Sequence, residues 1–168
     1  MRAFVLLALV AVVGCIPTGY APPTVVPVER SPLPVAASFD RTWNAAVELF
    51  ARENIPIEAP DRASGVLTSR DVIYTSGAKD TVTAYADCGI DYPNTPEWRA
   101  PRTPRRARFT AVIKGDSARS TILVRAFFFR FDEHSATHDD VECPTRGVFE
   151  SRTEKTVASH VESAQRKD

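Results

Sequence analysis

The first clear pattern along the chain is that of an amphipathic helix. Large apolar side chains recur at helical spacing: Phe39, Trp43, Ala46, Val47 and Phe50. Ser38 can cap this helix, because its side-chain oxygen can accept a backbone N–H of the first turn, and Asp40 places a negative charge where the helix dipole favours it. Pro56 ends the pattern. The sequence therefore predicts a helix from about Phe39 to Glu53.

After Pro56 the pattern changes to the alternation that is typical of strands, with Gly, Asp and Pro at the breaks. Five strands are predicted, over residues 57–59, 65–74, 81–88, 106–114 and 119–131. Gly115, Asp116 and Ser117 supply a hairpin turn between the last two.

The strand over residues 119–131 is apolar on both of its faces. One face carries Ile122, Val124, Ala126 and Phe128, and the other carries Leu123, Phe127, Phe129 and Phe131. Arg125 interrupts the second face. A strand of this kind belongs in the centre of a sheet, so we expect helices on one of its faces and a loop, a ligand or a partner on the other.

The C-terminal region returns to helical spacing and predicts a helix from Gly147 to about Gln165. Phe149, Val157, Val161 and Ala164 form its apolar face, and Arg152, Glu154, Lys155 and Glu162 are expected to face water. The order of elements predicts an α+β fold with an N-terminal helix, an antiparallel sheet of about five strands and a C-terminal helix packed on the sheet. A single domain over residues 38–168 contains all of these elements.

Residues 1–14 have the pattern of a secretory signal peptide. Arg2 is followed by an uncharged run from Ala3 to Val13. As a helix this run would rise about 16 Å, about half of the hydrocarbon core of a bilayer, so it is too short for a stable transmembrane anchor. A buried N-terminal helix is the alternative, but the run has no polar face to meet water.

The residues Val12, Val13, Gly14 and Cys15 resemble the lipobox of bacterial lipoproteins, in which a small residue precedes the cysteine that receives the lipid. The resemblance implies that the chain is cut before Cys15 and that acyl chains on this cysteine anchor the protein in a membrane. No aspartate follows Cys15 as a retention signal. In a source with two membranes, the resemblance therefore implies the periplasmic face of the outer membrane.

Prolines are concentrated directly after this cysteine. Six of the 13 lie in a short segment: Pro17, Pro22, Pro23, Pro27, Pro32 and Pro34. Proline at this density prevents a helix and favours extended backbone, so residues 15–37 are expected to be a lipidated cysteine and a semi-rigid tether. An edge strand over residues 24–26 is the alternative interpretation.

Composition limits the classes of function. Of the 168 residues, 43% are hydrophobic and 25% are charged, which is typical of a globular protein. Lys and Arg number 21, as do Asp and Glu, and this balance argues against a nucleic-acid-binding protein. The chain has no nucleophile elbow, phosphate loop or His-Glu-x-x-His motif. We therefore expect a non-enzymatic protein without a cofactor.

Two cysteines remain once Cys15 is assigned to the lipid. Cys88 and Cys143 are an even number in a compartment that is expected to be oxidising, which predicts a disulfide between them. A redox-active or metal-binding pair is the alternative, although Cys-x-x-Cys spacing is absent.

Two polar clusters are candidate binding sites. The first consists of Arg99, Arg102, Arg105, Arg106 and Arg108. It could contact an anionic partner, such as a lipid headgroup or an acidic protein surface, or form a solvated loop that is balanced by the acidic residues 132–142. The second consists of His134 and His138, which could bind zinc or copper from one helix face. A solvated loop is the preferred interpretation, so no metal site is predicted.

Part of the predicted domain resembles a known family. The segments 38–43, 53–57 and 61–69 are similar to the helix-grip domains of lipoprotein component C of the β-barrel assembly machinery. In that family an aromatic-rich helix leads through a short strand to an Asp-x-x-x-Gly-hydrophobic strand. The resemblance implies a helix-grip fold and a role as a binding or scaffold module in outer-membrane assembly or maintenance. The alternative is a carrier or sensor of a lipidic ligand, held in a cavity among Phe127, Phe129 and Phe131.

Overall fold

The computed structural model describes residues 19–26, 29–74, 82–92, 100–101, 103–131 and 140–165. The long helices of this part are α1 (Phe39–Arg52) and α3 (Val148–Gln165). The strands, in chain order, are β1 (Gly19–Ala21), β2 (Leu33–Val35), β3 (Ile57–Asp61), β4 (Val66–Ser69), β5 (Val72–Ile73), β6 (Ile90–Tyr92), β7 (Ala100–Pro101), β8 (Arg106–Gly115), β9 (Ser120–Phe131) and β10 (Asp140–Cys143).

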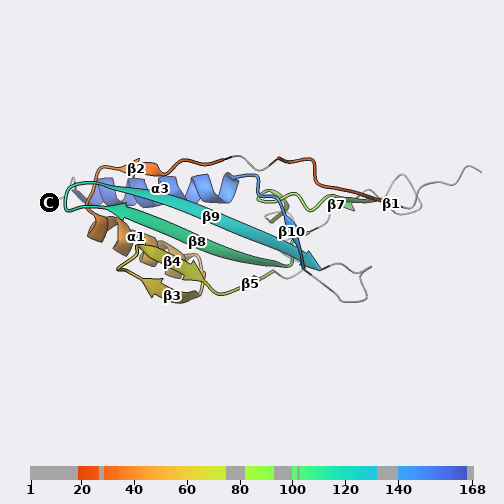
Figure 1. Ribbon diagram of the computed structural model, residues 1–168, viewed down its shortest axis with the longest axis horizontal. Helices are drawn as coiled ribbons and strands as arrows, with labels where there is room; N and C mark the ends of the chain where they lie inside the picture. The colour runs from red at the N-terminus through yellow and green to blue at the C-terminus, as the bar shows by residue number, and fades with distance from the viewer. Residues whose placement is uncertain are drawn as a thin grey trace, which may run out of the picture.

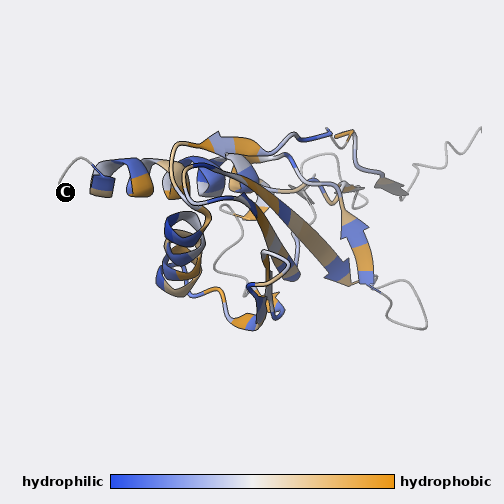
Figure 2. Cartoon of the chain, turned by 60° about the vertical axis from the view of Figure 1, so that its left-hand side comes forward, coloured by the Kyte–Doolittle hydropathy of each residue, from blue (hydrophilic) through white to orange (hydrophobic). Residues whose placement is uncertain are grey.

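Seven of these strands form one antiparallel sheet. Its order is β10-β9-β8-β4-β3, with β2 pairing β9 and β5 pairing β8, while β1, β6 and β7 form a small second sheet. Both helices contact the long strands from the same side, behind the sheet in Figure 1 and to its left in Figure 2. The predicted α+β fold, with an N-terminal helix and a C-terminal helix packed on an antiparallel sheet, is confirmed.

Three phenylalanines from three elements form the centre of the core. Phe109 of β8 stacks on Phe149 of α3 with ring centroids 4.3 Å apart, and Phe128 of β9 meets Phe109 edge-on at 6.0 Å. All three side chains are buried. Ser38 caps α1 as predicted, with its Oγ accepting the Arg41 backbone N–H. These contacts hold the helices against one face of the β8–β9 hairpin.

The prediction of a strand over residues 81–88 is wrong for residues 82–88, the part of this segment that the structure describes. Val82 and Thr83 are helical, and Ala86 makes an isolated bridge with Thr145. Val82 and Ala86 are both buried, and their spacing of four fits one helical face as well as a two-residue alternation. Conversely, β10 forms where the sequence predicts a loop. It forms because β9 has a free edge there, with Cys143 of β10 opposite Phe128 of β9.

The segment that was expected to be a tether contacts the domain in its described part. Strand β2 pairs with β9, and Leu33 lies opposite Ile122 and Val35 opposite Ser120. Pro34 lies between them in an edge strand, where the missing N–H is tolerated. The chain therefore joins the sheet before residue 38, and the edge strand forms at residues 33–35 rather than at 24–26.

Candidate functional site

The face of the sheet that points away from the helices is the candidate site. In β9 the even-numbered residues from Ser120 to Arg130 are buried, and the odd-numbered residues are half-buried or exposed. The register extends this division to β8, where Arg106 lies opposite Phe129 and Arg108 lies opposite Phe127. The outward row continues into β5, because Ile73 lies opposite Arg106.

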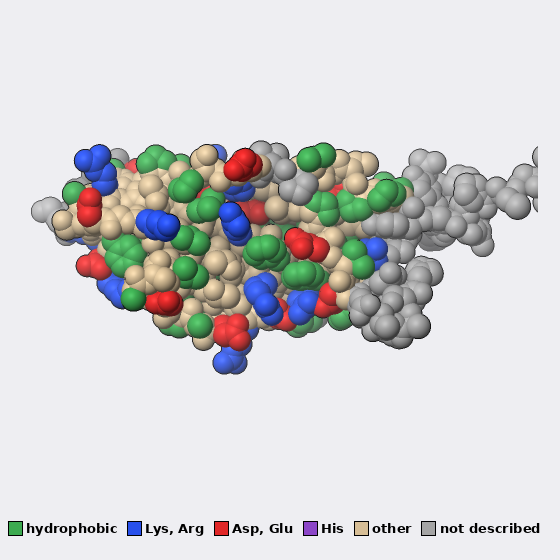
Figure 3. All heavy atoms as spheres, in the orientation of Figure 1, with side chains coloured by type: hydrophobic (Ala, Val, Ile, Leu, Met, Phe, Trp, Pro, Cys, Tyr) green, Lys and Arg blue, Asp and Glu red, His purple; other side chains and the backbone are tan. Residues whose placement is uncertain are grey.

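Apolar side chains on this face are accessible to solvent. Phe127 and Phe129 are half-buried, Phe131 is 51% exposed and Ile73 is 67% exposed. We call the surface formed by Ile73, Arg106, Arg108, Phe127, Phe129 and Phe131 the open face. It lies on the side shown in Figure 3, where green hydrophobic side chains are interspersed with blue and red charged ones. Exposed apolar side chains grouped in this way are typical of an interaction surface.

The arginines of the open face are paired with carboxylates. Arg106 forms ion pairs with Asp71, at 2.7 Å, and with Asp140. Its guanidinium also lies 4.7 Å from the centroid of the Phe129 ring, in a cation–π contact. The Arg108 side chain donates a hydrogen bond to the other oxygen of Asp71 at 3.1 Å. The hydrogen bond from Arg106, assisted by Arg108, lowers the pKa of Asp71 below its ordinary value.

These pairs change the interpretation of the predicted arginine cluster. Arg106 and Arg108 belong to strand β8 rather than to a loop, and nearby carboxylates match their charge. Arg105 is exposed beside them. Arg99 and Arg102 lie outside the described residues. The described arginines therefore do not form an unpaired basic patch of the kind that an anionic partner would need.

The predicted disulfide between Cys88 and Cys143 is confirmed. The two sulfur atoms are 1.99 Å apart, and both residues are buried. The bond ties the segment after residue 82 to the end of β10, beside the strand that carries Phe129 and Phe131. It thus holds one border of the open face in place.

The other predicted site residues are not in the described part of the chain. Cys15, His134 and His138 lie outside it. Within residues 19–26, 29–74, 82–92, 100–101, 103–131 and 140–165, no three His, Cys, Asp or Glu side chains are grouped as metal ligands. None of the helices described there is long and apolar enough to cross a membrane.

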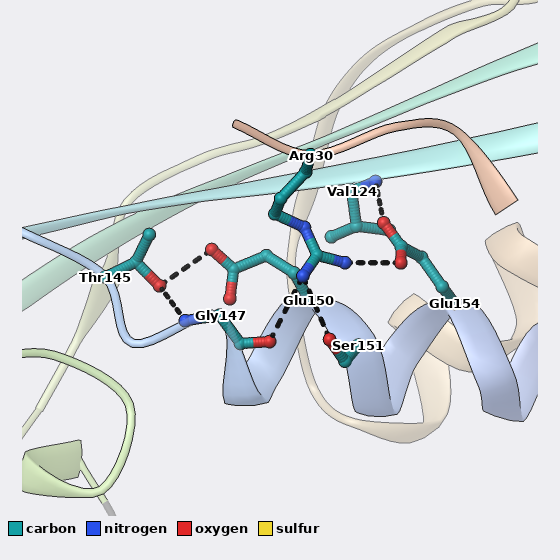
Figure 4. A network of polar contacts seen from close by, with 7 residues as sticks. All are labelled: Arg30, Val124, Thr145, Gly147, Glu150, Ser151 and Glu154. Carbon is teal, nitrogen blue, oxygen red and sulfur yellow. Dashed lines mark hydrogen bonds and ion pairs between the residues drawn. The ribbon is translucent and has the colours of Figure 1, made fainter. Parts of the chain in front are cut away.

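A buried polar network at the edge of β9 that faces away from β8, between the pairings with β2 and β10, was not predicted from the sequence (Figure 4). Glu154 Oε1 accepts the Val124 backbone N–H at 2.8 Å, and Glu154 Oε2 accepts a hydrogen bond from Arg30 at 2.5 Å. One turn earlier in α3, Glu150 Oε1 accepts the Thr145 hydroxyl at 2.7 Å. Burial raises the pKa of Glu154, while the Val124 N–H and the Arg30 charge oppose this shift.

The expectation that Glu154 faces water is wrong, because this residue is only 4% exposed. Its carboxylate accepts the Val124 N–H, which has no acceptor from a neighbouring strand at this point of β9. This explains why a charged residue is buried there. The signal was present in the sequence. Glu150, Glu154, Val157 and Val161 share one helical face, so the two carboxylates fall on the buried side of α3.

Comparisons with known proteins give no match for this chain. No family model, no curated protein and no solved structure matches it.

Proposed function

We propose that this chain is a non-enzymatic, membrane-anchored envelope lipoprotein whose open face binds a protein partner in outer-membrane assembly or maintenance. The observation that carries the proposal is the group of outward apolar side chains at one end of the sheet, above all Phe131 and Ile73. No helix of the described part lies on this face. A partner would remove these side chains from water, at a gain of about 25 cal/mol for each Å² of apolar surface buried.

The charges on the open face favour a protein over a lipid headgroup or a nucleic acid. Arg106 and Arg108 are matched by Asp71 and Asp140, so the surface presents paired charges of both signs around apolar groups. Interfaces between proteins have this composition, with an apolar centre and a polar rim. We therefore expect a partner surface that is apolar at its centre and carries both signs of charge at its rim.

A photo-reactive amino acid placed at Phe131 tests this surface in cells. The matched control position is Val148, which is 47% exposed but belongs to α3. We expect position 131 to capture one discrete envelope protein, position 148 to capture none, and Ile73→Asp to reduce capture at position 131. No capture at position 131, or equal capture at both positions, contradicts the proposal.

The membrane anchor has its own test. The lipobox resemblance implies acylation of Cys15, so a bacterial host fed with a labelled fatty acid should incorporate the label into the protein. Cys15→Ser should remove the label and release the protein from the membrane fraction. Full labelling of the Cys15→Ser variant would contradict lipidation at this residue.

The alternative function, a carrier of an apolar ligand, requires an enclosed space among the three phenylalanines of β9. Phe127, Phe129 and Phe131 alternate with the buried residues of β9 that face the helices, so the sheet and the helices do not enclose them. Native mass spectrometry of the Cys15→Ser protein distinguishes the two functions. A lipid that copurifies would favour the carrier function, and the protein mass alone would favour the docking function.

A further inference from the structure

A cavity of about 270 Å³ lies at the edge of β9 that faces away from β8. Its walls come from Glu29 and Arg30, from residues 124–127 of β9, from Glu142, Pro144 and Thr145, and from Glu150 of α3. Along this edge, residues 123–127 of β9 pair with no strand of the described part, because β2 pairs as far as Ile122 and β10 pairs only from Phe128. The cavity exceeds the space of a few water molecules, about 30 Å³ each. It lies at the small end of ligand pockets, which suits a small ligand or a single side chain.

Glu150 lines this cavity, and one of its carboxylate oxygens lacks a donor. Glu150 is 1% exposed, and its Oε1 accepts the Thr145 hydroxyl. Its Oε2 is buried and has no hydrogen-bond partner among the described residues. A buried carboxylate oxygen without a donor costs free energy, so a donor that enters the cavity would be held there.

The charges around the cavity favour a cation as that donor. Glu29, Glu142 and Glu150 line it, against Arg30 and Arg125. The two terminal nitrogens of the Arg30 guanidinium are already engaged by the neighbouring Glu154, as Figure 4 shows, and by Ser151 at 2.9 Å. Its Nε is buried and has no hydrogen-bond partner among the described residues. A ligand with N–H donors and a positive charge would therefore supply the donor that Glu150 Oε2 lacks, whereas an anion would meet three carboxylates.

We propose that this cavity binds an organic cation, an ammonium or guanidinium group on a short aliphatic stem, through Glu150 Oε2. Val124, Ala126 and Pro144 supply apolar surface for the stem. Two sources offer this chemistry, a free small amine and a lysine or arginine side chain of a protein. The site lies at the opposite edge of β9 from β8 and shares only Phe127 with the open face.

An NMR titration of the full chain carrying Cys15→Ser tests the site. The probes are agmatine, as a free amine, and acetyl-Gly-Arg-Gly-amide, as a side chain in a peptide. The same peptide with citrulline keeps the shape but lacks the charge. We expect saturable shifts of the amides of residues 124–127 and 142–150 with a cationic probe and none with the citrulline peptide. Binding of agmatine would identify a free amine as sufficient, and binding of the arginine peptide alone would identify a protein side chain. Saturation by neither cationic probe, or equal saturation by the citrulline peptide, overturns the proposal.

Two variants separate the site from general stability. Glu150→Gln keeps the shape of the side chain and should weaken binding at least about tenfold, because it removes the charge from the acceptor. Glu162→Gln, at an exposed position of the same helix, should bind as the unchanged protein does. Ala126→Val keeps the carboxylate and narrows the cavity, so it should also weaken binding and decides the question if Glu150→Gln does not fold. Unchanged binding by a folded Glu150→Gln or Ala126→Val variant overturns the proposal.

Discussion

Replacing Arg30 by methionine removes the cation of a buried ion pair and keeps much of the aliphatic side chain. Arg30 lies in the N-terminal segment and Glu154 in α3, so this pair fastens the start of the chain to its last helix. In the variant, Glu154 Oε1 keeps the Val124 N–H, but Oε2 loses its donor. The structure therefore predicts a loss of stability well above that of a surface substitution.

The magnitude follows from the burial of the two side chains. Loss of one partner from a fully buried pair costs about 3–5 kcal/mol. The side chain of Glu154 is 5% exposed, but that of Arg30 is 23% exposed, so water can partly replace the lost charge. We expect Arg30→Met to lower the free energy of unfolding by about 2–3 kcal/mol at pH 7.

The pH dependence distinguishes an electrostatic loss from a packing loss. Burial raises the pKa of Glu154 above its model-peptide value of 4.5, and Arg30 opposes that rise. A carboxyl group with a raised pKa in the folded state stabilises the protein most at low pH, and this stabilisation falls as pH rises through the unfolded and then the folded pKa. Arg30→Met raises the folded pKa further, so its cost should grow from pH 4 to pH 7.

Urea unfolding, followed by the fluorescence of the buried Trp43, measures both effects. Arg70→Met is the matched control, because Arg70 is exposed and should change stability by less than about 0.5 kcal/mol. A cost for Arg30→Met below about 1 kcal/mol at pH 7, or an equal cost at pH 4 and pH 7, would refute the conclusion that this buried ion pair stabilises the fold.

Three further predictions concern the disulfide, a glycine and an aspartate. Replacing both Cys88 and Cys143 by serine should lower the free energy of unfolding in urea by about 4 kcal/mol, because the bond closes a loop across 55 positions. The control is the unchanged protein with its disulfide reduced, which should lose the same stability. Gly65→Ala should cost at least about 2 kcal/mol and lower the melting temperature, because φ is +74° and the new Cβ would lie 2.0 Å from the Ile113 carbonyl oxygen. Asp71 has a lowered pKa, so it stabilises the fold above its unfolded value near 3.8 and loses this effect as pH falls. Acid titration of Asp71→Asn should therefore show a shallower loss of stability than the unchanged protein, and identical profiles would contradict the Arg106–Asp71 pair.

The parts of the fold that were predicted correctly are those in which local pattern and tertiary structure agree. Helix α1 carries its apolar stripe, its cap and its terminator within one segment, so the sequence is sufficient to place it. Strand β9 is apolar on both faces, and this indicated a central strand with helices on one side. The cysteine pair could be predicted because only two candidates remained.

The parts that were missed depend on residues that are distant in the sequence. Strand β10 has little apolar character of its own and forms because β9 offers it an edge at Phe128. Arg106 and Arg108 were predicted to contact an anionic partner or to lie in a solvated loop balanced by residues 132–142, but they lie in β8 and pair with Asp71, directly before β5. Glu154 was predicted to face water, but its carboxylate accepts the backbone N–H of Val124 in β9. In each case a contact with a distant segment decides the role of a polar residue.

The contacts of the N-terminal segment also bear on how the domain would meet a membrane. A free tether over residues 15–37 would hold the domain far from the bilayer, but β1 pairs with β6 from Gly19 onward, and the Asp87 carboxylate accepts the backbone N–H groups of Thr24 and Val25. If the lipid is on Cys15, only the residues between it and Gly19 remain as a spacer, with a reach of at most about 14 Å. The β1–β6–β7 end of the molecule would then lie next to the membrane, and the C-terminal end of β9, which carries Phe131, lies toward the same end in Figure 1. A partner of the open face would therefore bind close to the bilayer surface. Release of the Arg30–Glu154 contact alone would not lengthen the spacer, because β1 lies nearer to the anchor along the chain than Arg30 does.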